Sequence, residues 1–284
     1  MHSMQIAFQK MHGLGNDFVV IDTRAMSQGA AFSLNTQTIR ALGNRHTGIG
    51  FDQLLIIDSA PDDNADIAYR IFNQDGASVN QCGNGARCIA AFIAQTDALN
   101  SNDALIMHSP AGNVHARLCD DGQVAVDMGT PRFAPVSLPL IGFEQSDSYT
   151  LAIDGHEHAF CAVSVGNPHA VLFIDDVSAA SVQTLGSAFN AHAAFPQGVN
   201  VGFAHVRDRN TMDLRVFERG VGETRACGTG ACAAMVCAHN TGRVGPTVSV
   251  ALPGGTLVID WRGENDTITM TGPATFSFSG SFAL

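Results

Sequence analysis

Two stretches of this sequence repeat the same order of residues 145 positions apart. The first is RIFNQDGASVNQCGNGA at residues 70–86, and the second is RVFERGVGETRACGTGA at residues 215–231. In both, a phenylalanine precedes a cysteine by ten residues, and that cysteine begins a Cys-Gly-X-Gly turn. Such internal similarity indicates a duplicated unit, and therefore two similar domains related by a pseudo-twofold axis.

Two weaker matches occur earlier in each half and in the same order. Gly15-Asn16 and Gly166-Asn167 each precede an apolar run that ends in Ile-Asp. Gln53 and Asn200 then each lie near a glycine-flanked run. Three elements in one order strengthen the case for duplication.

The local patterns predict short strands and two alanine-rich helices. Apolar runs bounded by Gly, Asp and Asn are typical of strands, and they occur at residues 18–21, 54–57, 170–173 and 248–251. The alanine-rich segments 86–94 and 231–239 follow the two Cys-Gly-X-Gly turns. Alanine is a good helix former and is small enough for tight packing. We expect an α+β fold in which each domain is a curved, mostly antiparallel sheet or barrel around a central helix.

The expected domains are residues 1–127 with 273–284, and residues 128–272. The boundary falls near Asp127 to Pro131, and the last strand is expected to return to the first domain. Met4 is expected to be the natural start, with Met1 to Ser3 as an extension.

The composition indicates a compact enzyme. Of 284 residues, 45% are apolar and 14% are charged, against about 25% charged in an average soluble protein. The net charge is -11 and no lysine or arginine cluster is present, which argues against a nucleic-acid partner. No apolar run approaches the roughly 20 residues of a membrane helix, and the start lacks the pattern of a signal peptide. A cytoplasmic location is therefore expected, with no membrane partner.

The seven cysteines do not suggest disulfides or a zinc site. An odd number in a chain expected in the cytoplasm argues against a disulfide framework. No Cys-X-X-Cys is present, and cysteines spaced by five residues spread around a helix axis. We interpret the five that lie outside the first position of the two turns as small buried residues: Cys88, Cys119, Cys161, Cys232 and Cys237.

Cys82 and Cys227 differ from the other five cysteines because each lies where a helix is expected to begin. The free N–H groups of a helix start bind anions such as a carboxylate and favour a thiolate. Forming a thiolate at pH 7 costs roughly 2 kcal/mol for a thiol with a pKa of about 8.5, and a helix start supplies on the order of 0.3–1 kcal/mol, or up to about 2 when partly buried. Two such starts could hold one α-carboxylate, with a sulfur on each side of the α-carbon. The alternative is that both turns only cap helices.

At these residues the sequence resembles the diaminopimelate epimerase family over nearly its whole length. A single Cys-Gly-X-Gly turn is a weak signal, whereas all the matching blocks in one order are specific. The blocks are Met11 to Phe18, Gly50 to Gln53, Phe72-Asn73 through Asp75-Gly76 to Cys88, Gly166 to His169, Asn200-Val201, and Glu218 through Thr224 to Gly230.

The resemblance implies an isomerase that interconverts LL- and meso-diaminopimelate, for lysine and cell-wall synthesis, without pyridoxal phosphate or metal. It implies Cys82 and Cys227 as the catalytic pair, with His169 and Glu218 beside the thiols as supporting acid/base groups. It also implies a homodimer. The positions matching the substrate contacts of the family are Asn16, Gln53, Asn73, Gly83, Asn84, Asn167, Asn200, Glu218, Arg219, Gly228 and Thr229. Amide side chains both donate and accept, and arginine can take a carboxylate bidentately.

Four other functions remain open from the residues. Proline and hydroxyproline racemases also use paired cysteines, and isomerases of the phenazine-biosynthesis type share the two-sided design. A cysteine hydrolase could use Cys82 as nucleophile and His169 as base, although Cys227 would then have no role. A non-catalytic protein could bind an amino acid on the same fold. The first of these is the principal alternative, and Arg219 together with the asparagines weighs against it.

Overall fold

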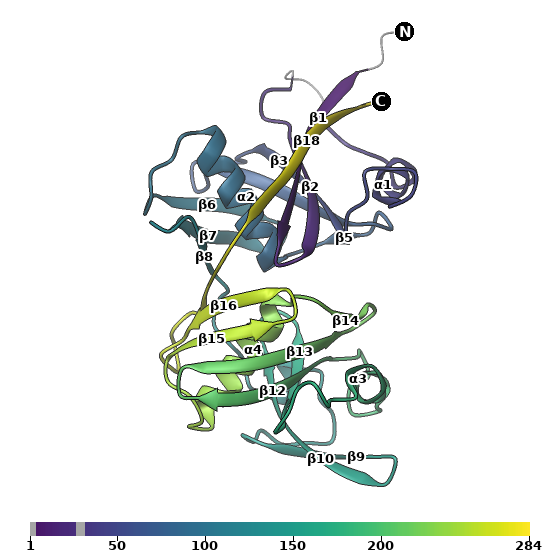
Figure 1. The fold of residues 1–284 in the computed structure, drawn as a ribbon, viewed down its shortest axis with the longest axis vertical. Helices are drawn as coiled ribbons and strands as arrows, with labels where there is room; N and C mark the ends of the chain where they lie inside the picture. Colours follow the sequence, from purple (N-terminus) through teal and green to yellow (C-terminus); the bar gives the residue numbers. More distant parts are fainter. Residues whose placement is uncertain (1–3, 27–31) are drawn as a thin grey trace. The chain divides into compact units, whose positions relative to one another are not determined.

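The computed structural model describes residues 4–26 and 32–284, so the expected extension at Met1 to Ser3 lies outside the described residues. The chain divides into two compact units. Unit 1 consists of Met1–Val126 and Gly272–Leu284, and unit 2 consists of Asp127–Thr271. Figure 1 shows the elements of both units.

Unit 1 contains a mixed sheet and two helices. Its strands follow the order β18-β1-β2-β3-β4-β6-β7-β8. Adjacent strands are antiparallel except for β2–β3 and β4–β6, and β5 pairs with the last part of β4. The elements are β1 (Gln5–Gly13), β2 (Asn16–Asp22), α1 (Thr36–Gly43), β3 (Gln53–Ser59), β4 (Ile67–Asn73), β5 (Ser78–Val79), α2 (Gly83–Thr96), β6 (Ala104–Ser109), β7 (Gly112–Leu118), β8 (Val124–Asp127) and β18 (Thr275–Ala283).

Unit 2 repeats this order of pairing. Its strands run β9-β10-β11-β12-β13-β15-β16-β17, with β11–β12 and β13–β15 as the parallel pairs and β14 beside the end of β13. The elements are η1 (Pro135–Ser137), β9 (Tyr149–Ile153), β10 (His156–Ser164), β11 (Pro168–Phe173), α3 (Val182–Ala191), β12 (Asn200–Asp208), β13 (Thr211–Glu218), β14 (Gly222–Thr224), α4 (Gly228–Asn240), β15 (Thr247–Leu252), β16 (Gly255–Asp260) and β17 (Thr269–Gly272). The sequence repeat therefore corresponds to a repeated strand topology.

Each unit curves its sheet around one helix. The helix α2 packs against β1, β2, β3 and β7, strands from opposite ends of its sheet, and α4 packs against strands from β10 to β16 (Figure 1). Apart from Thr229, His239 and Asn240, every residue of α4 is buried. A helix that is apolar on all sides is stable only when it is enclosed. The predicted fold class of sheet-dominated α+β structure is confirmed, and so are the predicted strands and both alanine-rich helices.

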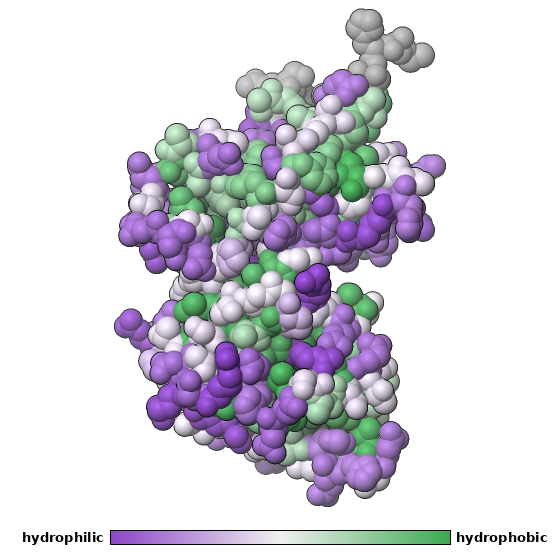
Figure 2. Space-filling model, in the orientation of Figure 1, coloured by the Kyte–Doolittle hydropathy of each residue, from purple (hydrophilic) through white to green (hydrophobic). Residues whose placement is uncertain are grey.

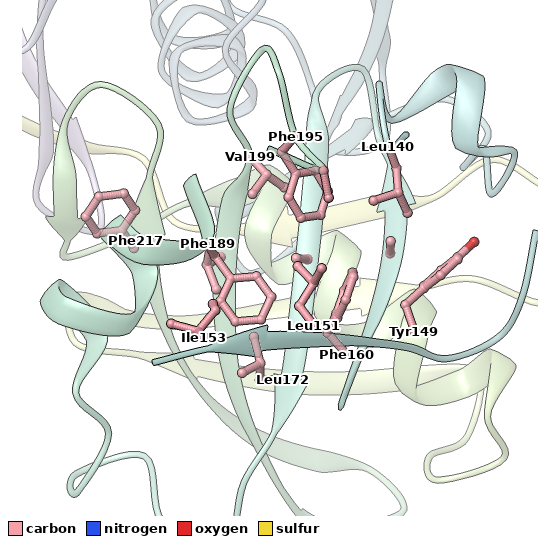
Figure 3. Packing of buried hydrophobic residues seen from close by; sticks show 14 of the residues in the cluster. Leu140, Tyr149, Leu151, Ile153, Phe160, Leu172, Phe189, Phe195, Val199 and Phe217 are labelled. Atoms are coloured by element: carbon pink, nitrogen blue, oxygen red, sulfur yellow. The ribbon is translucent and has the colours of Figure 1, made fainter. Parts of the chain in front are cut away.

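A second layer of core lies on the other side of the unit 2 sheet, beneath α3. Figure 3 shows Phe160, Phe189 and Phe195 packed together in this layer. The ring centroids of Phe160 and Phe189 are 5.5 Å apart in an edge-to-face arrangement, which is a favourable geometry for aromatic rings. The same cluster includes Phe217, the residue before Glu218 at the end of β13.

The helix α3 approaches β13 closely at Gly186. A Cβ atom added to Gly186 would lie 2.5 Å from both Cβ and Cγ of Phe217. Real Cβ atoms do not tolerate such a distance, so this contact requires glycine. The close packing fixes the end of β13, where Glu218 lies.

The surface carries an apolar strand in unit 1. Figure 2 shows hydrophilic residues over much of the visible surface, with apolar residues over β1 and β18. Phe276 and Phe278 of β18 are 38% and 51% exposed. Among the described residues, no helix combines the length and the apolar character needed to cross a bilayer.

Four of the five cysteines interpreted as buried are buried, but Cys119 is not. Cys119 is partly exposed because it lies in the turn that follows β7, where its N–H donates to the carbonyl of Gln123. Within the described residues, the seven cysteines form no disulfide bond with one another.

Candidate active site

Both cysteines of the repeated turns begin a helix. Cys82 is the N-cap of α2, and its Sγ accepts a hydrogen bond from the N–H of Gly85 at 3.4 Å. Cys227 is the N-cap of α4, and its Sγ accepts from the N–H of Gly230 at 3.3 Å. The N-cap side chain thus satisfies one of the free N–H groups of its helix. The predicted position of each cysteine at a helix start is confirmed.

The second glycine of each turn allows this close approach. A Cβ atom on Gly85 would lie 3.2 Å from Cδ2 of Leu55, and one on Gly230 would lie 3.0 Å from Cγ2 of Val216. The first turn of each helix therefore packs directly on a strand of its own sheet. Any larger side chain would displace the helix start and the thiol with it.

In unit 1, a line of hydrogen bonds fixes two asparagines near Cys82. Asn84 Nδ2 donates to Asn16 Oδ1 at 3.2 Å, and Arg87 Nη2 donates to Asn84 Oδ1 at 2.9 Å. Asn16 Nδ2 in turn donates to Asp52 Oδ2 at 2.9 Å. Since each amide has a defined donor and acceptor side, both side chains have a fixed orientation.

An ion-pair network of Asp17, Asp52, Lys10 and Arg45 adjoins Asn16. Asp17 is contacted by Lys10 and by both terminal nitrogens of Arg45, and Arg45 also reaches Asp52 at 2.7 Å. Burial by itself raises the pKa of Asp17, but the hydrogen bonds from Arg45 and Lys10 outweigh it and lower that pKa to about 2. Asp52 accepts hydrogen bonds from both Arg45 and Asn16.

Gln53 and Asn73 form a second amide pair in unit 1. They lie opposite each other on β3 and β4, and Gln53 Nε2 donates to Asn73 Oδ1 at 3.0 Å. The other side-chain atom, Gln53 Oε1, is buried and accepts no hydrogen bond. An unsatisfied buried acceptor is costly, and a ligand N–H or water would satisfy it.

In unit 2, a chain of hydrogen bonds leads away from Cys227. Cys227 Sγ lies 3.6 Å from Thr229 Oγ1, which accepts from Asn167 Nδ2 at 3.3 Å. Asn167 Oδ1 lies 3.1 Å from His169 Nε2, and Asn200 Nδ2 lies 3.5 Å from the same nitrogen. These five residues come from three elements and the loop before β11, and the fold brings them together.

His169 is buried and neutral. It is 1% exposed, and burial followed by the positive charge of Arg219 lowers its pKa to about 3. Its Nδ1 is buried and has no hydrogen-bond partner. Since Asn167 Nδ2 donates to Thr229, Asn167 Oδ1 is the acceptor for His169 Nε2, and the neutral imidazole orients this amide.

Cys227 is held as a thiol. Burial raises the pKa of Cys227 well above the ordinary value, and the negative charge of Glu218 raises it further. Hydrogen bonds from Thr229 and from the N–H of Gly230 lower that pKa, but they are the smaller effects. The helix start lowers the pKa of Cys227 as expected, through the N–H of Gly230, but burial and Glu218 outweigh this effect and the net shift is upward. Cys82 is less buried than Cys227.

Arg219 makes two hydrogen bonds within unit 2. Its backbone N–H donates to Asn200 Oδ1 at 2.8 Å, while Nη1 donates to the carbonyl of Gln197 at 2.7 Å. The residue is exposed. Gly83 and Gly228 are the first residues of α2 and α4, so their N–H groups belong to the free ends of those helices.

Arg70 and Arg215, which occupy equivalent places in the repeat, form ion pairs within their own units. Arg70 pairs with Asp58 at 2.7 Å, and Arg215 pairs with Glu223 at 2.7 Å. Each also donates to a loop carbonyl. Within residues 4–26 and 32–284, no group of three or more His, Cys, Asp and Glu side chains is placed to hold a metal ion.

Two features of the site did not follow from the sequence. Asp17 and Asp52 adjoin the expected contact residues Asn16 and Gln53, and that adjacency was the one available signal. The ion pairs of Arg45 with Asp17 and Asp52 could not be predicted from its position in the chain.

Comparison with known proteins gives a family match and similar sequences that carry the same description. A family described as diaminopimelate epimerase matches residues 8–134 and 161–277. The diaminopimelate epimerase of Pseudomonas entomophila is 48% identical over 281 residues, covering 99% of this chain and 100% of that protein. That of Thioalkalivibrio sulfidiphilus is 49% identical over 280 residues, covering 98% of this chain and 99% of that protein.

Solved structures with low sequence identity share the fold. A hydroxyproline epimerase from Agrobacterium vitis matches with a TM-score of 0.70 at 17% identity, covering 99% of this chain and 93% of that chain. A phenazine biosynthesis protein from Bacillus anthracis matches with a TM-score of 0.68 at 14% identity, covering 99% of this chain and 100% of that chain. At such identities the likeness establishes the fold alone.

Proposed function

Because this chain belongs to the diaminopimelate epimerase family, we propose that it interconverts LL- and meso-diaminopimelate without a cofactor, on the route to lysine and the cell wall. The observation that carries the proposal is the pair of cysteines that each cap a helix, Cys82 on α2 and Cys227 on α4. The support for the substrate is identity of 48% and 49% to two diaminopimelate epimerases over nearly the whole chain.

We propose that the two thiols act as acid and base on one α-carbon. In one direction a thiolate removes the α-proton while the other thiol delivers a proton to the opposite face. The first sulfur ends as a thiol and the second as a thiolate, so the reverse reaction uses the same groups with exchanged roles. The high pKa of Cys227 supports Cys227 as the proton donor of the substrate-free enzyme.

The helix starts supply what the carbanion needs. As the α-proton leaves, negative charge moves onto the α-carboxylate. We propose that the first residues of α2, Gly83 and Asn84, and those of α4, Gly228 and Thr229, contact those oxygens. Donors fixed before the reaction stabilise developing charge more effectively than water does.

The amides and the arginine are proposed to bind the distal amino-acid end of the substrate. That end carries an ammonium and a carboxylate, which require acceptors and donors together. The proposed distal contacts are Asn16, Gln53, Asn73, Asn167, Asn200 and Arg219, while Glu218 is proposed to contact the substrate beside Cys227. A cradle for a second charged end distinguishes this function from that of a proline or hydroxyproline racemase.

His169 and Glu218 are proposed as supporting groups. Glu218 raises the pKa of Cys227 and so sets its protonation. His169 is neutral, and its Nε2 lies between Asn167 and Asn200. We assign to it the orientation of the Asn167 amide, whose Oδ1 accepts from His169 Nε2, rather than the transfer of a proton.

We further propose that the enzyme is a cytoplasmic homodimer. The exposed phenylalanines Phe276 and Phe278 on β18 support self-association, because apolar patches of this kind mark protein interfaces. Sedimentation velocity would show a dimer for the unsubstituted chain and a monomer for Phe278→Ser. A monomer for both would contradict the dimer.

The catalytic proposal is tested with reduced protein and LL-diaminopimelate in D2O, without added cofactor. Loss of the α-proton NMR signal together with appearance of the meso isomer is expected. Cys82→Ser and Cys227→Ser then separate the two thiols. Absence of exchange by folded, reduced protein would refute diaminopimelate as substrate, and proline and hydroxyproline would be tested next.

A further inference from the structure

Thr224 makes a short hydrogen bond to the carboxylate of Glu218. Thr224 Oγ1 donates to Glu218 Oε1 at 2.5 Å, and both side chains are half-buried. Glu218 lies opposite Gly222, and Thr224 lies opposite Val216, in the antiparallel pair β13–β14. Glu218 and Thr224 are therefore diagonal neighbours on one face of the hairpin, close enough for their side chains to interact.

The hairpin that carries Thr224 is itself anchored. Arg215 Nε and Nη2 donate to the two carboxylate oxygens of Glu223 at 2.7 and 2.9 Å. Arg215 Nη1 also donates to the carbonyl of Val177 at 2.8 Å. A bidentate pair holds both partners in one geometry, so the backbone that carries the next residue, Thr224, is held in place.

Unit 1 has the same hairpin with different side chains. In the pair β4–β5, Val79 lies opposite Ile71, as Thr224 lies opposite Val216 in unit 2. The residue that ends β4 is Asn73, which is held by Gln53 Nε2. The repeat thus places an amide and a valine in unit 1 where unit 2 has a carboxylate and a hydroxyl.

The carboxylate of Glu218 acts on Cys227. The first turn of α4 packs on β13, since a Cβ atom on Gly230 would lie 3.0 Å from Val216 Cγ2. The groups that alter the protonation of this thiol within unit 2 are Glu218 on β13, and Thr229 and the N–H of Gly230 on α4. Of these, Glu218 is the charged one, and its rotamer decides how strongly it acts.

We propose that Thr224 is a positioning residue, whose hydroxyl holds the Glu218 carboxylate beside Cys227 and thereby makes the thiol of unit 2 different from that of unit 1. The catalytic meaning of this assignment rests on the proposed function. The hydrogen bond itself and its effect on Cys227 do not.

The test removes only the hydroxyl. Thr224→Val keeps the shape of the side chain and gives unit 2 the residue of unit 1. We expect kcat for epimerisation to fall by about tenfold or more, as for loss of an acid/base contribution, with a much smaller change in KM. Thr224→Ser should restore kcat because it restores the donor. Thr224→Ala checks the result with a smaller side chain that cannot overpack.

A second readout needs no substrate. The rate at which iodoacetamide alkylates Cys227 at pH 7.5, mapped by peptide mass, reports its thiolate fraction. Thr224→Val should increase this rate, because a carboxylate that turns away no longer opposes the thiolate. Glu218→Gln should increase it similarly, and the double variant should show no further increase. Val79→Thr in unit 1 is the matched control and should leave the alkylation rate of Cys227 unchanged.

Two outcomes would overturn the proposal. The first is unchanged Cys227 alkylation in folded Thr224→Val and Thr224→Ala. The second is a double variant in which the effects of Thr224→Val and Glu218→Gln simply add, since independent effects mean that Thr224 does not act through Glu218. If the chain did not epimerise diaminopimelate at all, the alkylation series would still decide between these results.

Discussion

The neutral, buried His169 makes stability depend on pH in the acid range. Its pKa falls from 6.5 to about 3 on folding, because burial and then the charge of Arg219 disfavour the imidazolium. Because the unfolded chain binds the proton more readily, the free energy of unfolding is highest above pH 6.5 and falls as the pH falls toward 3. At about 1.4 kcal/mol per pH unit the full contribution is about 5 kcal/mol, of which about 2 kcal/mol is lost by pH 5.

The assay is urea unfolding of the native sequence and of His169→Gln between pH 8 and pH 5. Glutamine cannot be protonated here, so the variant should lose about 2 kcal/mol less than the native sequence over this range. His156→Gln is the matched control, because His156 lies on the neighbouring strand β10 with an exposed ring. Its curve should run parallel to that of the native sequence.

NMR of the histidine rings provides the direct check. The His169 signals, identified by their absence in His169→Gln, should not titrate between pH 8 and pH 5. A titration midpoint within that range, or parallel stability curves for the native sequence and His169→Gln, would refute the assignment of a neutral, desolvated imidazole.

Three further perturbations have defined outcomes. Gly186→Ala should lower the free energy of unfolding by about 1–3 kcal/mol in thermal or urea unfolding, because the added methyl meets Phe217 at 2.5 Å; an unchanged melting temperature would contradict the close packing. Asp52→Asn should raise KM for diaminopimelate more than it lowers kcat, because Asn16 loses the carboxylate that orients its amide; a selective loss of kcat would argue against this orienting role. Cys227→Ala should reduce the loss of stability above about pH 8.5, because the buried thiol of Cys227 resists ionisation in the folded state and ionises freely in the unfolded chain; identical alkaline unfolding curves would contradict a raised pKa for Cys227.

The sequence by itself determined the repeated architecture, because the repeat is carried by local signals. A cysteine before Gly-X-Gly and an alanine-rich run specify a capped helix, and short apolar runs between turn residues specify strands. These signals act within about ten residues, which is why residues 86–94 and 231–239 were correctly predicted as helices. The same blocks, in order, were specific enough to indicate the family.

The tertiary structure decided the environment of each side chain, which depends on contacts far apart in the chain. The helix start at Cys227 favours a thiolate, but burial and Glu218 outweigh it and keep Cys227 a thiol. The support of Asn16 by Arg45 joins residues 29 positions apart, through ion pairs with Asp17 and Asp52. Protonation and orientation follow from desolvation and long-range hydrogen bonds, and these arise only when the sheet has brought the strands together.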